Sequence, residues 1–357
     1  MKKPRTRVPE GLRSIASERG LLFGAAVANA DLEAEAFQKA LLRECSLISP
    51  EYEMKWDAIA ALGYGPADAL AGFAKTYGLA VHGHALWWHG AVPDRLAGVP
   101  ADRFSAEAMD HLAATVRRYA GPAISWDVVN EPLDLDCGRS DGLRASPFLD
   151  AFGPGYIATA FRAVAEADPS AVLVLNEMGL EYASPEAERK RRTMLMLLER
   201  ELAAGTPIHA LGLQSHIDAG HQPRENPGLA AFLREVAGLG LSVMITEMDV
   251  SDWRCPRAER DAMVADAYRW HIELVLESCP TLAVTTWGLT DGRTWLSAHR
   301  PRADGAPVRP LPLDRRLRRK PAWYGIAQAM AVQGAASASA ATGHSPRTIR
   351  PDDEELV

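Results

Sequence analysis

The sequence predicts a single-domain α/β protein folded as a (β/α)8 barrel, the TIM-barrel architecture. Eight short runs rich in Val, Ile and Leu alternate with longer segments whose apolar residues recur at helical spacing. A chain of 357 residues is ordinary for one such barrel. Polar and aromatic residues follow seven of the eight runs. Barrels of this class gather their functional groups at the carboxyl ends of the strands.

The predicted strands and helices follow one another in the order that a parallel barrel requires. The alternative is an open, doubly wound sheet, but no GxGxxG motif follows the first strand, so its dinucleotide-binding form has little support. The clearest helical segments are 66–78, 226–240 and 258–277, and the second of them ends in glycine, as helices often do. The predicted strands are 21–27, 45–49, 79–86, 123–129, 171–177, 208–214, 241–249 and 282–289.

The ends of the chain differ in composition from its centre. We expect an N-terminal extension over residues 1–14, one barrel domain over 15–333 and a flexible C-terminal tail over 334–357. The tail is rich in small, polar and charged residues, which bury too little apolar surface to fold. Nothing in the sequence indicates a second folded domain.

Composition and charge exclude several classes of protein. Hydrophobic residues make up 47% and charged residues 24%, which is typical of a soluble globular protein, and we expect a monomer. The net charge of −7 argues against a general nucleic-acid surface, and no apolar run is long enough to span a membrane. The basic N-terminus lacks the apolar segment of a signal peptide. We therefore expect a cytoplasmic protein if the chain is complete, or a secreted or periplasmic one if a signal peptide has been removed.

The four cysteines are widely separated. Cys45, Cys137, Cys255 and Cys279 form no CxxC pair, so a zinc site is not expected. Cys45 and Cys279 lie beside predicted strands, and we expect them to be buried thiols. A chain of this length needs no disulfide, although the sequence leaves disulfide pairing open.

The segment "ISWDVVNEPL", residues 124–133, shows how one strand ends in a polar pair. Pro132 has no N–H for a sheet ladder, so the strand should stop before it. Proline also favours an extended conformation at Glu131. Asn130 and Glu131 then stand at the carboxyl end of the strand, which is a poor place for core residues and a good place for a site.

The other strand ends carry the same kind of residue. Buried charged groups are costly unless they are paired or take part in function, so this convergence indicates a site. The residues are Glu51, Tyr52 and Lys55 after the second strand, His84, Trp88 and His89 after the third, Asn176 and Glu177 after the fifth, Gln214 and His216 after the sixth, Glu247 and Asp249 after the seventh, and Trp287, Asp291 and Trp295 after the eighth.

The residue types at these strand ends favour carbohydrate chemistry. Two carboxylates on separate strands, Glu131 and Glu247, suit cleavage of a glycosidic bond. Tryptophan faces match the C–H faces of sugars, and amides, histidines and lysine offer hydrogen bonds to hydroxyls. No GxSxG elbow supports acyl transfer. A metal site from His84, His89 and His216 is an alternative, but the many Trp and amide groups favour sugar recognition, so we expect no metal and no cofactor.

Six motifs, in this order, give the chain a family resemblance: "EYEMKW", "GHALWWH", "WDVVNE", "LQSH", "ITEMD" and "WGLTDGRTWL". With them the chain resembles glycoside hydrolase family ten, the endo-β-1,4-xylanases that fold as TIM barrels, over roughly residues 20–330. The resemblance implies a retaining endo-hydrolase that cleaves internal β-1,4 bonds of xylan or xylooligosaccharides through a glycosyl-enzyme intermediate. Such an enzyme would hold its two carboxyl groups ~5–5.5 Å apart.

The resemblance also implies roles for single residues. Glu131 matches the general acid/base and Glu247 the nucleophile. Asn130 matches the amide that bonds the sugar 2-hydroxyl, and His216 matches the histidine that bonds the nucleophile, with Asp249 behind it. Gln214 matches a position that supports the nucleophile, and the positions that match substrate contacts are Glu51, Tyr52, Lys55, His84, Trp88, Trp287 and Trp295.

Four features depart from the family pattern. Tyr52 stands where the family usually has Asn, Ala91 where Gln is frequent and Met178 where Tyr is common. The segment 56–70 is also shorter than the usual linker to the second helix. These departures leave both carboxylates in place, but they bear on how substrate binds beside the bond that is cut.

Three other functions compete with xylan hydrolysis. Tyr52 and Ala91 suggest the same chemistry on a related β-glycan or on short oligosaccharides. A carbohydrate-binding barrel without catalysis would be marked by loss of a carboxylate, but both are present. A metal-dependent hydrolase that used the histidines would lose its activity to a chelator.

Overall fold

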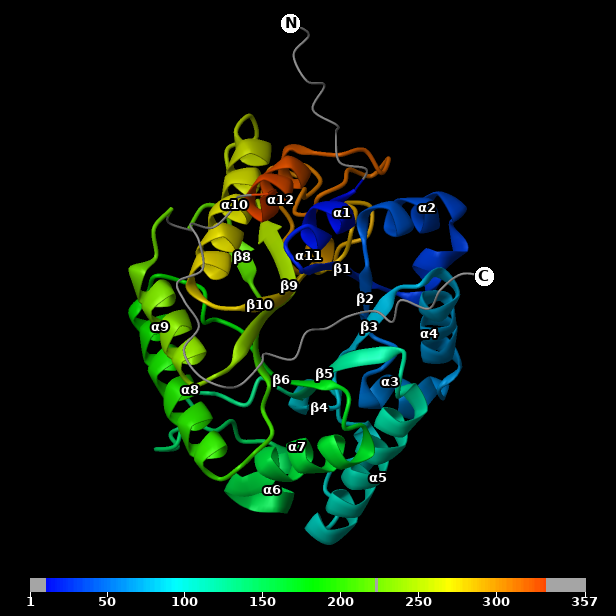
Figure 1. Cartoon of the computed structure of the whole chain (residues 1–357), viewed down its shortest axis with the longest axis vertical. Coiled ribbons are helices and arrows are strands. Elements are labelled where there is room, and N and C mark those ends of the chain that lie inside the picture. The colour runs from blue at the N-terminus through cyan, green and yellow to red at the C-terminus, as the bar shows by residue number, and fades with distance from the viewer. Residues whose placement is uncertain (1–10, 222–223, 332–357) are drawn as a thin grey trace, which may run out of the picture.

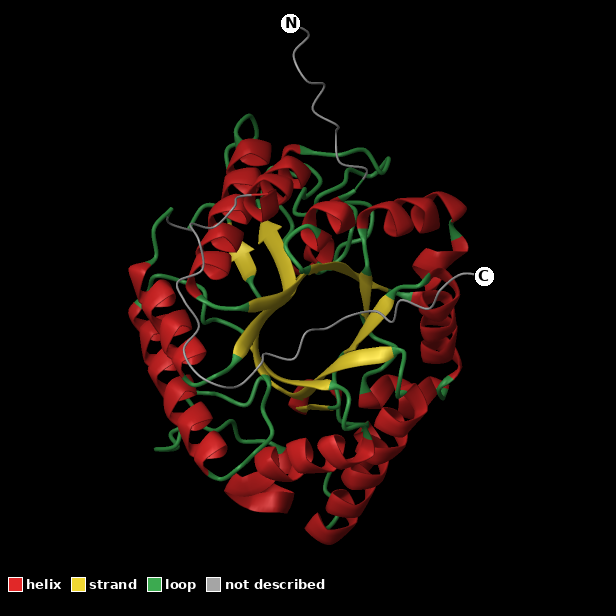
Figure 2. Ribbon diagram, in the orientation of Figure 1, coloured by secondary structure: helices red, strands yellow, loops and turns green. Residues whose placement is uncertain are grey.

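The computed structural model describes residues 11–221 and 224–331, and its centre is a closed barrel of parallel strands (Figure 1). Helices surround this ring on the outside (Figure 2). Each of the eight predicted strands overlaps an observed one, so the predicted fold class is confirmed. The barrel strands are β1 (Leu22–Val27), β2 (Leu47–Pro50), β3 (Ala80–Gly83), β5 (Ala123–Asn130), β6 (Val172–Glu177), β7 (Ala210–Leu213), β9 (Ser242–Ser251) and β10 (Thr281–Thr286).

The strands follow sequence order around the barrel. Neighbours pair in the order β10-β1-β2-β3-β5-β6-β7-β9, and pairing of β9 with β10 closes the ring. Every one of these ladders is parallel, so all carboxyl ends meet at one rim. Two short strands, β4 (Trp87–Trp88) and β8 (His216–Asp218), extend the sheet beside β5 and β9 at that rim.

The predicted helices at 66–78, 226–240 and 258–277 are observed as α4, α9 and α10. Several helices begin at a capping side chain: the Asn226 oxygen accepts a bond from the Leu229 N–H at 3.1 Å, and the Ser184 hydroxyl accepts one from the Ala187 N–H at 3.2 Å. The α-helices are α1 (Leu12–Ser17), α2 (Glu35–Glu44), α3 (Trp56–Leu62), α4 (Gly65–Tyr77), α5 (Ala101–Tyr119), α6 (Pro147–Phe152), α7 (Tyr156–Ala167), α8 (Pro185–Ala203), α9 (Pro227–Gly238), α10 (Arg260–Ser278), α11 (Leu296–His299) and α12 (Pro321–Ala331). The 3-10 helices are η1 (Asn29–Glu33), η2 (His89–Ala91), η3 (Asp94–Leu96) and η4 (Gly153–Gly155).

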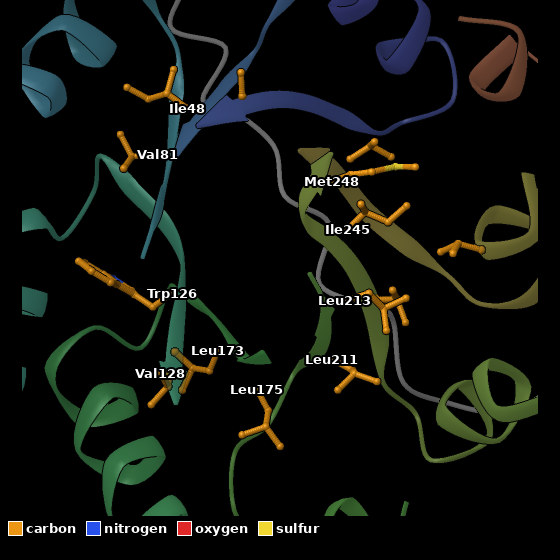
Figure 3. Packing of buried hydrophobic residues seen from close by; sticks show 14 of the residues in the cluster. Ile48, Val81, Trp126, Val128, Leu173, Leu175, Leu211, Leu213, Ile245 and Met248 are labelled. Carbon is orange, nitrogen blue, oxygen red and sulfur yellow. The ribbon is translucent and has the colours of Figure 1, made fainter. Parts of the chain in front are cut away.

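The core has two layers because strand side chains alternate between the two faces of the sheet. The larger layer lies between the strands and the helices, where side chains such as Trp126, Leu175 and Ile245 point away from the barrel axis (Figure 3). The smaller layer fills the barrel itself and consists of Leu22, Leu47, Ala80, Val172, Val174, Ala210, Met244 and Ala283. This inner layer closes the barrel below the polar rim.

The two ends of the described chain pack on the barrel. Helix α1 begins at Leu12, which is buried, so the last residues of the segment expected as an N-terminal extension belong to this helix. The expected tail, 334–357, lies outside the described residues. All four cysteines are free thiols, and Cys45 and Cys279 are buried as predicted. Within the described residues, no helix is long and apolar enough to cross a membrane.

Candidate active site

Glu131 follows the last residue of β5 in an unusual backbone conformation. Its φ is +56°, in the left-handed region, so the prediction of an extended Glu131 before Pro132 is wrong. Tertiary hydrogen bonds override the effect of proline. The Glu131 N–H donates to the Asn176 carbonyl at 2.9 Å, and Arg144 Nε donates to the Glu131 carbonyl at 2.9 Å. Such a conformation costs about 1–3 kcal/mol and persists where its surroundings enforce it.

Glu247 owes its direction to an irregularity in β9. Between β9 and β10 the register runs from Ile245↔Val284 to Met248↔Thr286, so β9 carries one extra residue over this stretch. A bulge of this kind re-aims side chains. As a result the consecutive residues Thr246 and Glu247 both contact Asn176 in the barrel. Glu247 is buried, with 5% of its surface exposed.

Asn176, on β6, lies between the two halves of the site. Its amide nitrogen donates to Glu247 Oε1 at 2.7 Å and to Asn130 Oδ1 at 2.9 Å. The Thr246 hydroxyl donates to Asn176 Oδ1 at 2.7 Å, which fixes the orientation of the amide. Gly212 on the neighbouring strand makes room for it, because a Cβ there would lie 2.3 Å from Asn176 Oδ1. The strand-end pattern placed Asn176 at the rim, but it gave no sign of this central position.

A second amide, Gln214, ties Glu131 to the same network. Its Nε2 donates to Glu131 Oε1 at 3.1 Å and to Asn130 Oδ1 at 3.2 Å. Together with Asn176, it forms an unbroken chain of contacts from Glu131 through Asn130 to Glu247. Three side-chain amides thus link two carboxylates that come from separate strands.

His216 contacts the other side of Glu247. Its Nε2 lies 3.4 Å from Glu247 Oε2, and its Nδ1 lies 3.0 Å from Asp249 Oδ1. The Trp295 indole N–H donates to the second oxygen of Asp249 at 2.6 Å. Glu247 and Asp249 therefore face the same imidazole, as expected for residues two positions apart on one strand.

His84 approaches Glu247 from β3. Its Nδ1–H donates to Asp127 Oδ2 at 2.8 Å and lies 3.8 Å from Glu247 Oε1. Behind it, His82 Nε2 lies 3.0 Å from the same Asp127 oxygen. The Asp127 carboxyl is fully buried, which by itself would raise its pKa, but His82 and His84 outweigh burial and lower that pKa to about 2. Neither His82 nor Asp127 was predicted as a site residue, because both lie inside strands rather than at strand ends.

The histidines of the alternative metal hypothesis do not converge. His89 Nε2 lies 3.9 Å from Glu131, His216 binds Asp249, and His84 binds Asp127. Within the described residues, one set of potential ligand atoms lies within 4.8 Å of one another, and it comprises His84, Asp127 and Glu247. In this set, His84 and Asp127 are close because they share a hydrogen bond, and Glu247 Oε1 lies 3.8 Å from His84 Nδ1.

The charges around Glu247 and His216 favour an ion pair. Burial alone would raise the pKa of Glu247, but His84 and His216 outweigh it and lower that pKa. Burial would lower the pKa of His216, but Asp249 and Glu247 outweigh it and raise that pKa well above its usual value. At neutral pH the carboxylate of Glu247 is therefore ionised beside a cationic imidazole.

Aromatic and charged side chains form one wall of the site. The Lys55 ammonium lies 4.8 Å from the ring centre of Trp88 and 5.8 Å from that of Trp287. The Trp287 ring lies edge-on to His84, at 5.0 Å between ring centres. Burial lowers the pKa of Lys55, which Glu247 and Glu51 oppose.

Burial and nearby carboxylates raise the pKa of Glu51, while Lys55 opposes the shift. Tyr52 does not belong to this wall: it is 44% exposed, and its ring makes no hydrogen bond or aromatic contact with the other predicted site residues in the described chain.

The other two residues that depart from the family pattern differ in their exposure. Met178 is 41% exposed, whereas Ala91 is buried.

Glu177, beside Met178, accepts hydrogen bonds from Lys190 Nζ at 2.9 Å and from the Leu133 N–H at 3.0 Å. It thereby fixes the loop that follows Glu131. Burial raises its pKa to about 6, although Lys190 opposes that shift.

Comparison with known proteins assigns the chain to a family. The profile of glycosyl hydrolase family 10 matches residues 11–329. The chain belongs to glycosyl hydrolase family 10. The predicted resemblance is thereby confirmed, and the chain is classed as a glycoside hydrolase. A curated relative, endo-1,4-beta-xylanase 5 of Pyricularia oryzae, is 29% identical over 338 residues, which cover 91% of this chain and 80% of that protein.

Solved structures of family 10 proteins share the fold. Xylanase 10B of Thermotoga petrophila, solved in complex with xylobiose, has a TM-score of 0.81 at 26% identity and covers 92% of this chain and 98% of its own. The family 10 protein of Paenibacillus barcinonensis has a TM-score of 0.79 at 31% identity, with coverage of 90% and 97%.

Proposed function

We propose that this family 10 protein is an endo-β-1,4-xylanase that hydrolyses internal bonds of xylan or xylooligosaccharides with retention. One observation carries the proposal: Gln214, Asn130 and Asn176 link Glu131 to Glu247 by hydrogen bonds without a gap. A fixed pair of carboxyl groups is what double displacement requires. The xylanase names of its relatives support the substrate class.

In the first step, Glu131 donates its proton to the leaving glycosidic oxygen while the Glu247 carboxylate bonds to the anomeric carbon. His84 and His216 lower the pKa of Glu247, which keeps its carboxyl group ionised for attack. The amide of Asn176 and the imidazole of His216 hold the carboxylate in one orientation. Asn130, at the middle of the amide chain, bonds the sugar 2-hydroxyl.

In the second step, the roles of Glu131 reverse. Formation of the glycosyl ester has removed the negative charge of Glu247. Glu131 is now a carboxylate and takes a proton from water. The resulting oxygen attacks the anomeric carbon and releases Glu247. Two inversions at the same carbon give net retention. Trp88, Trp287 and Lys55 form the wall that positions the sugar on one side of the cut.

Hydrolysis of xylan with product anomers followed by proton NMR tests the proposal. Wild type should release β-anomers first, and Glu247→Ala should be inactive. Products that appear first as α-anomers would contradict retention. Mixed-linkage β-glucan cleaved faster than xylan would contradict the substrate, and loss of activity in a chelator would favour the metal hypothesis instead.

A further inference from the structure

A pocket opens beside the catalytic pair, on the segments that follow β5, β6, β8, β9 and β10. Its volume is about 650 Å³, within the range of small-molecule sites. Two lining residues connect it directly to the site. Arg144 Nε donates to the backbone carbonyl of Glu131 at 2.9 Å, and the Tyr182 hydroxyl donates to the backbone carbonyl of His216 at 3.0 Å.

One wall of this pocket is fixed by hydrogen bonds. The indole N–H of Trp253 donates to Asp218 Oδ2 at 2.6 Å, and the Asp218 N–H donates to the Tyr182 hydroxyl oxygen at 3.0 Å. Asp218 is buried, and Trp253 is partly buried. These hydrogen bonds hold the Trp253 ring at the edge of the wall.

Two arginines lie over that ring. The guanidinium carbon of Arg254 is 4.1 Å from the ring centre of Trp253, and that of Arg300 is 5.7 Å from it. Both side chains are exposed. Within the described residues, neither guanidinium lies within 4 Å of a carboxylate, although Arg254 does contact the ring of His221. Two positive charges at the pocket thus lack an anionic partner.

The pocket's carboxylates are largely engaged elsewhere. Asp218 accepts from Trp253, and Asp134 pairs with Arg144 at 3.3 Å. Glu186 lies in the first turn of α8, where hydrogen bonds from its own backbone N–H and the Ser184 hydroxyl lower its pKa. Asp136, on the loop after β5, also lines the pocket. The charges over the Trp253 ring itself are those of Arg254 and Arg300, on a chain whose net charge is −7.

We propose that this pocket binds an acidic sugar substituent, a uronate carboxylate carried on the xylan chain, through Arg254 and Arg300. The inference rests on the proposed function and adds a substrate class to it. Guanidinium groups pair with carboxylates through two parallel hydrogen bonds, and a sugar ring can pack against the Trp253 edge. The local cations also offset the repulsion that an acidic protein exerts on an anionic polymer.

Paired substrates test this inference. The first is a xylan substituted with uronate, and the second is the same polymer after its carboxyl groups have been reduced to alcohols. For wild type, kcat/KM should be about five- to tenfold higher on the acidic polymer at low salt. The preference should shrink towards one at 1 M salt, where the screening length is about 3 Å. A wild-type ratio of one at low salt would overturn the inference.

Arginine variants assign the preference to the pocket. The double variant R254Q/R300Q should lower the ratio of the two kcat/KM values to about one, whereas partial unfolding would lower both values equally and keep the ratio. The matched control R117Q/R192Q removes the same charge from exposed positions that do not line this pocket, and it should keep the wild-type ratio.

An unchanged ratio in R254Q/R300Q, or an equal loss in the control, would overturn the inference. A wild type inactive on both polymers would instead overturn the proposed function.

Discussion

The floor of the site and its outer margin are built differently. On the floor, Asn176 is fully buried and Glu247 is 5% exposed, and each makes several polar contacts with neighbouring strands. At the margin, Tyr52 is 44% and Met178 41% exposed. Floor residues are thus fixed by several strands at once, whereas margin residues depend on a single loop. Substitutions on the floor should therefore affect the chemical step, and substitutions at the margin should affect which substrate is preferred.

The largest effect is expected at Glu247. Glu247→Ala removes the attacking oxygen, so kcat on xylan should fall by at least about 10⁴-fold. Steady-state rates measure the loss, and added azide should restore turnover by forming an α-glycosyl azide, because the small anion enters the vacated space. A variant that keeps more than a tenth of wild-type activity would exclude Glu247 as nucleophile.

Glu131 should show a loss that depends on the leaving group. Glu131→Gln removes the proton donor, and kcat/KM on xylan should fall by about 10²–10⁴-fold. An aryl xyloside with an acidic phenol needs no proton to leave, so its first step should be much less affected. A burst of released phenol followed by slow turnover would show this. Equal losses on both substrates would contradict the role of acid/base.

A smaller loss is expected from the amide that links the two carboxylates. Asn176→Ala removes a donor to Glu247 and to Asn130, and kcat should fall by about 10²-fold. Asn226→Ala is the matched control, since it deletes a buried amide that caps α9 away from the site. The control should cost about 1 kcal/mol of stability and leave kcat in place. Thermal unfolding together with rates separates the two outcomes.

The pH profile tests the ion pair on the floor. Activity should be lost as pH falls through the lowered pKa of Glu247, because the protonated carboxyl cannot attack. His216→Asn removes a cation that lowers this pKa, so the acid limb of kcat/KM should move to higher pH by about one unit. His299→Asn, at an exposed position, should leave the limb in place. A limb that stays fixed in His216→Asn would contradict the role of His216 in lowering this pKa.

The same contrast explains what the sequence predicted. The eight strands followed from apolar runs and their spacing, and the rim residues followed from polar groups at strand ends. Both are local signals. The parallel barrel then brings Glu131, Gln214 and Glu247 together, because all carboxyl ends meet at one rim.

Features that depend on distant contacts did not emerge from the sequence. Asn176 bonds residues 46 and 71 positions away, and its central place depends on the register of neighbouring strands. The bulge that turns both Thr246 and Glu247 inward leaves no mark in the strand pattern. The left-handed conformation of Glu131 runs against the local effect of Pro132, since the bonds from Arg144 and to the Asn176 carbonyl override it.

The smallest effect is expected at the margin, where Tyr52 replaces the asparagine common in the family. An exposed phenol without contacts to the floor should influence binding rather than chemistry. Tyr52→Asn should therefore change KM for short xylooligosaccharides by about two- to fivefold and leave kcat nearly unchanged, which corresponds to less than about 1 kcal/mol. Tyr77→Asn, at a tyrosine of α4 whose exposure is similar, is the control and should change neither value. A loss in kcat on the scale of Asn176→Ala would mean that Tyr52 reaches the reacting sugar, and the division between floor and margin would then fail.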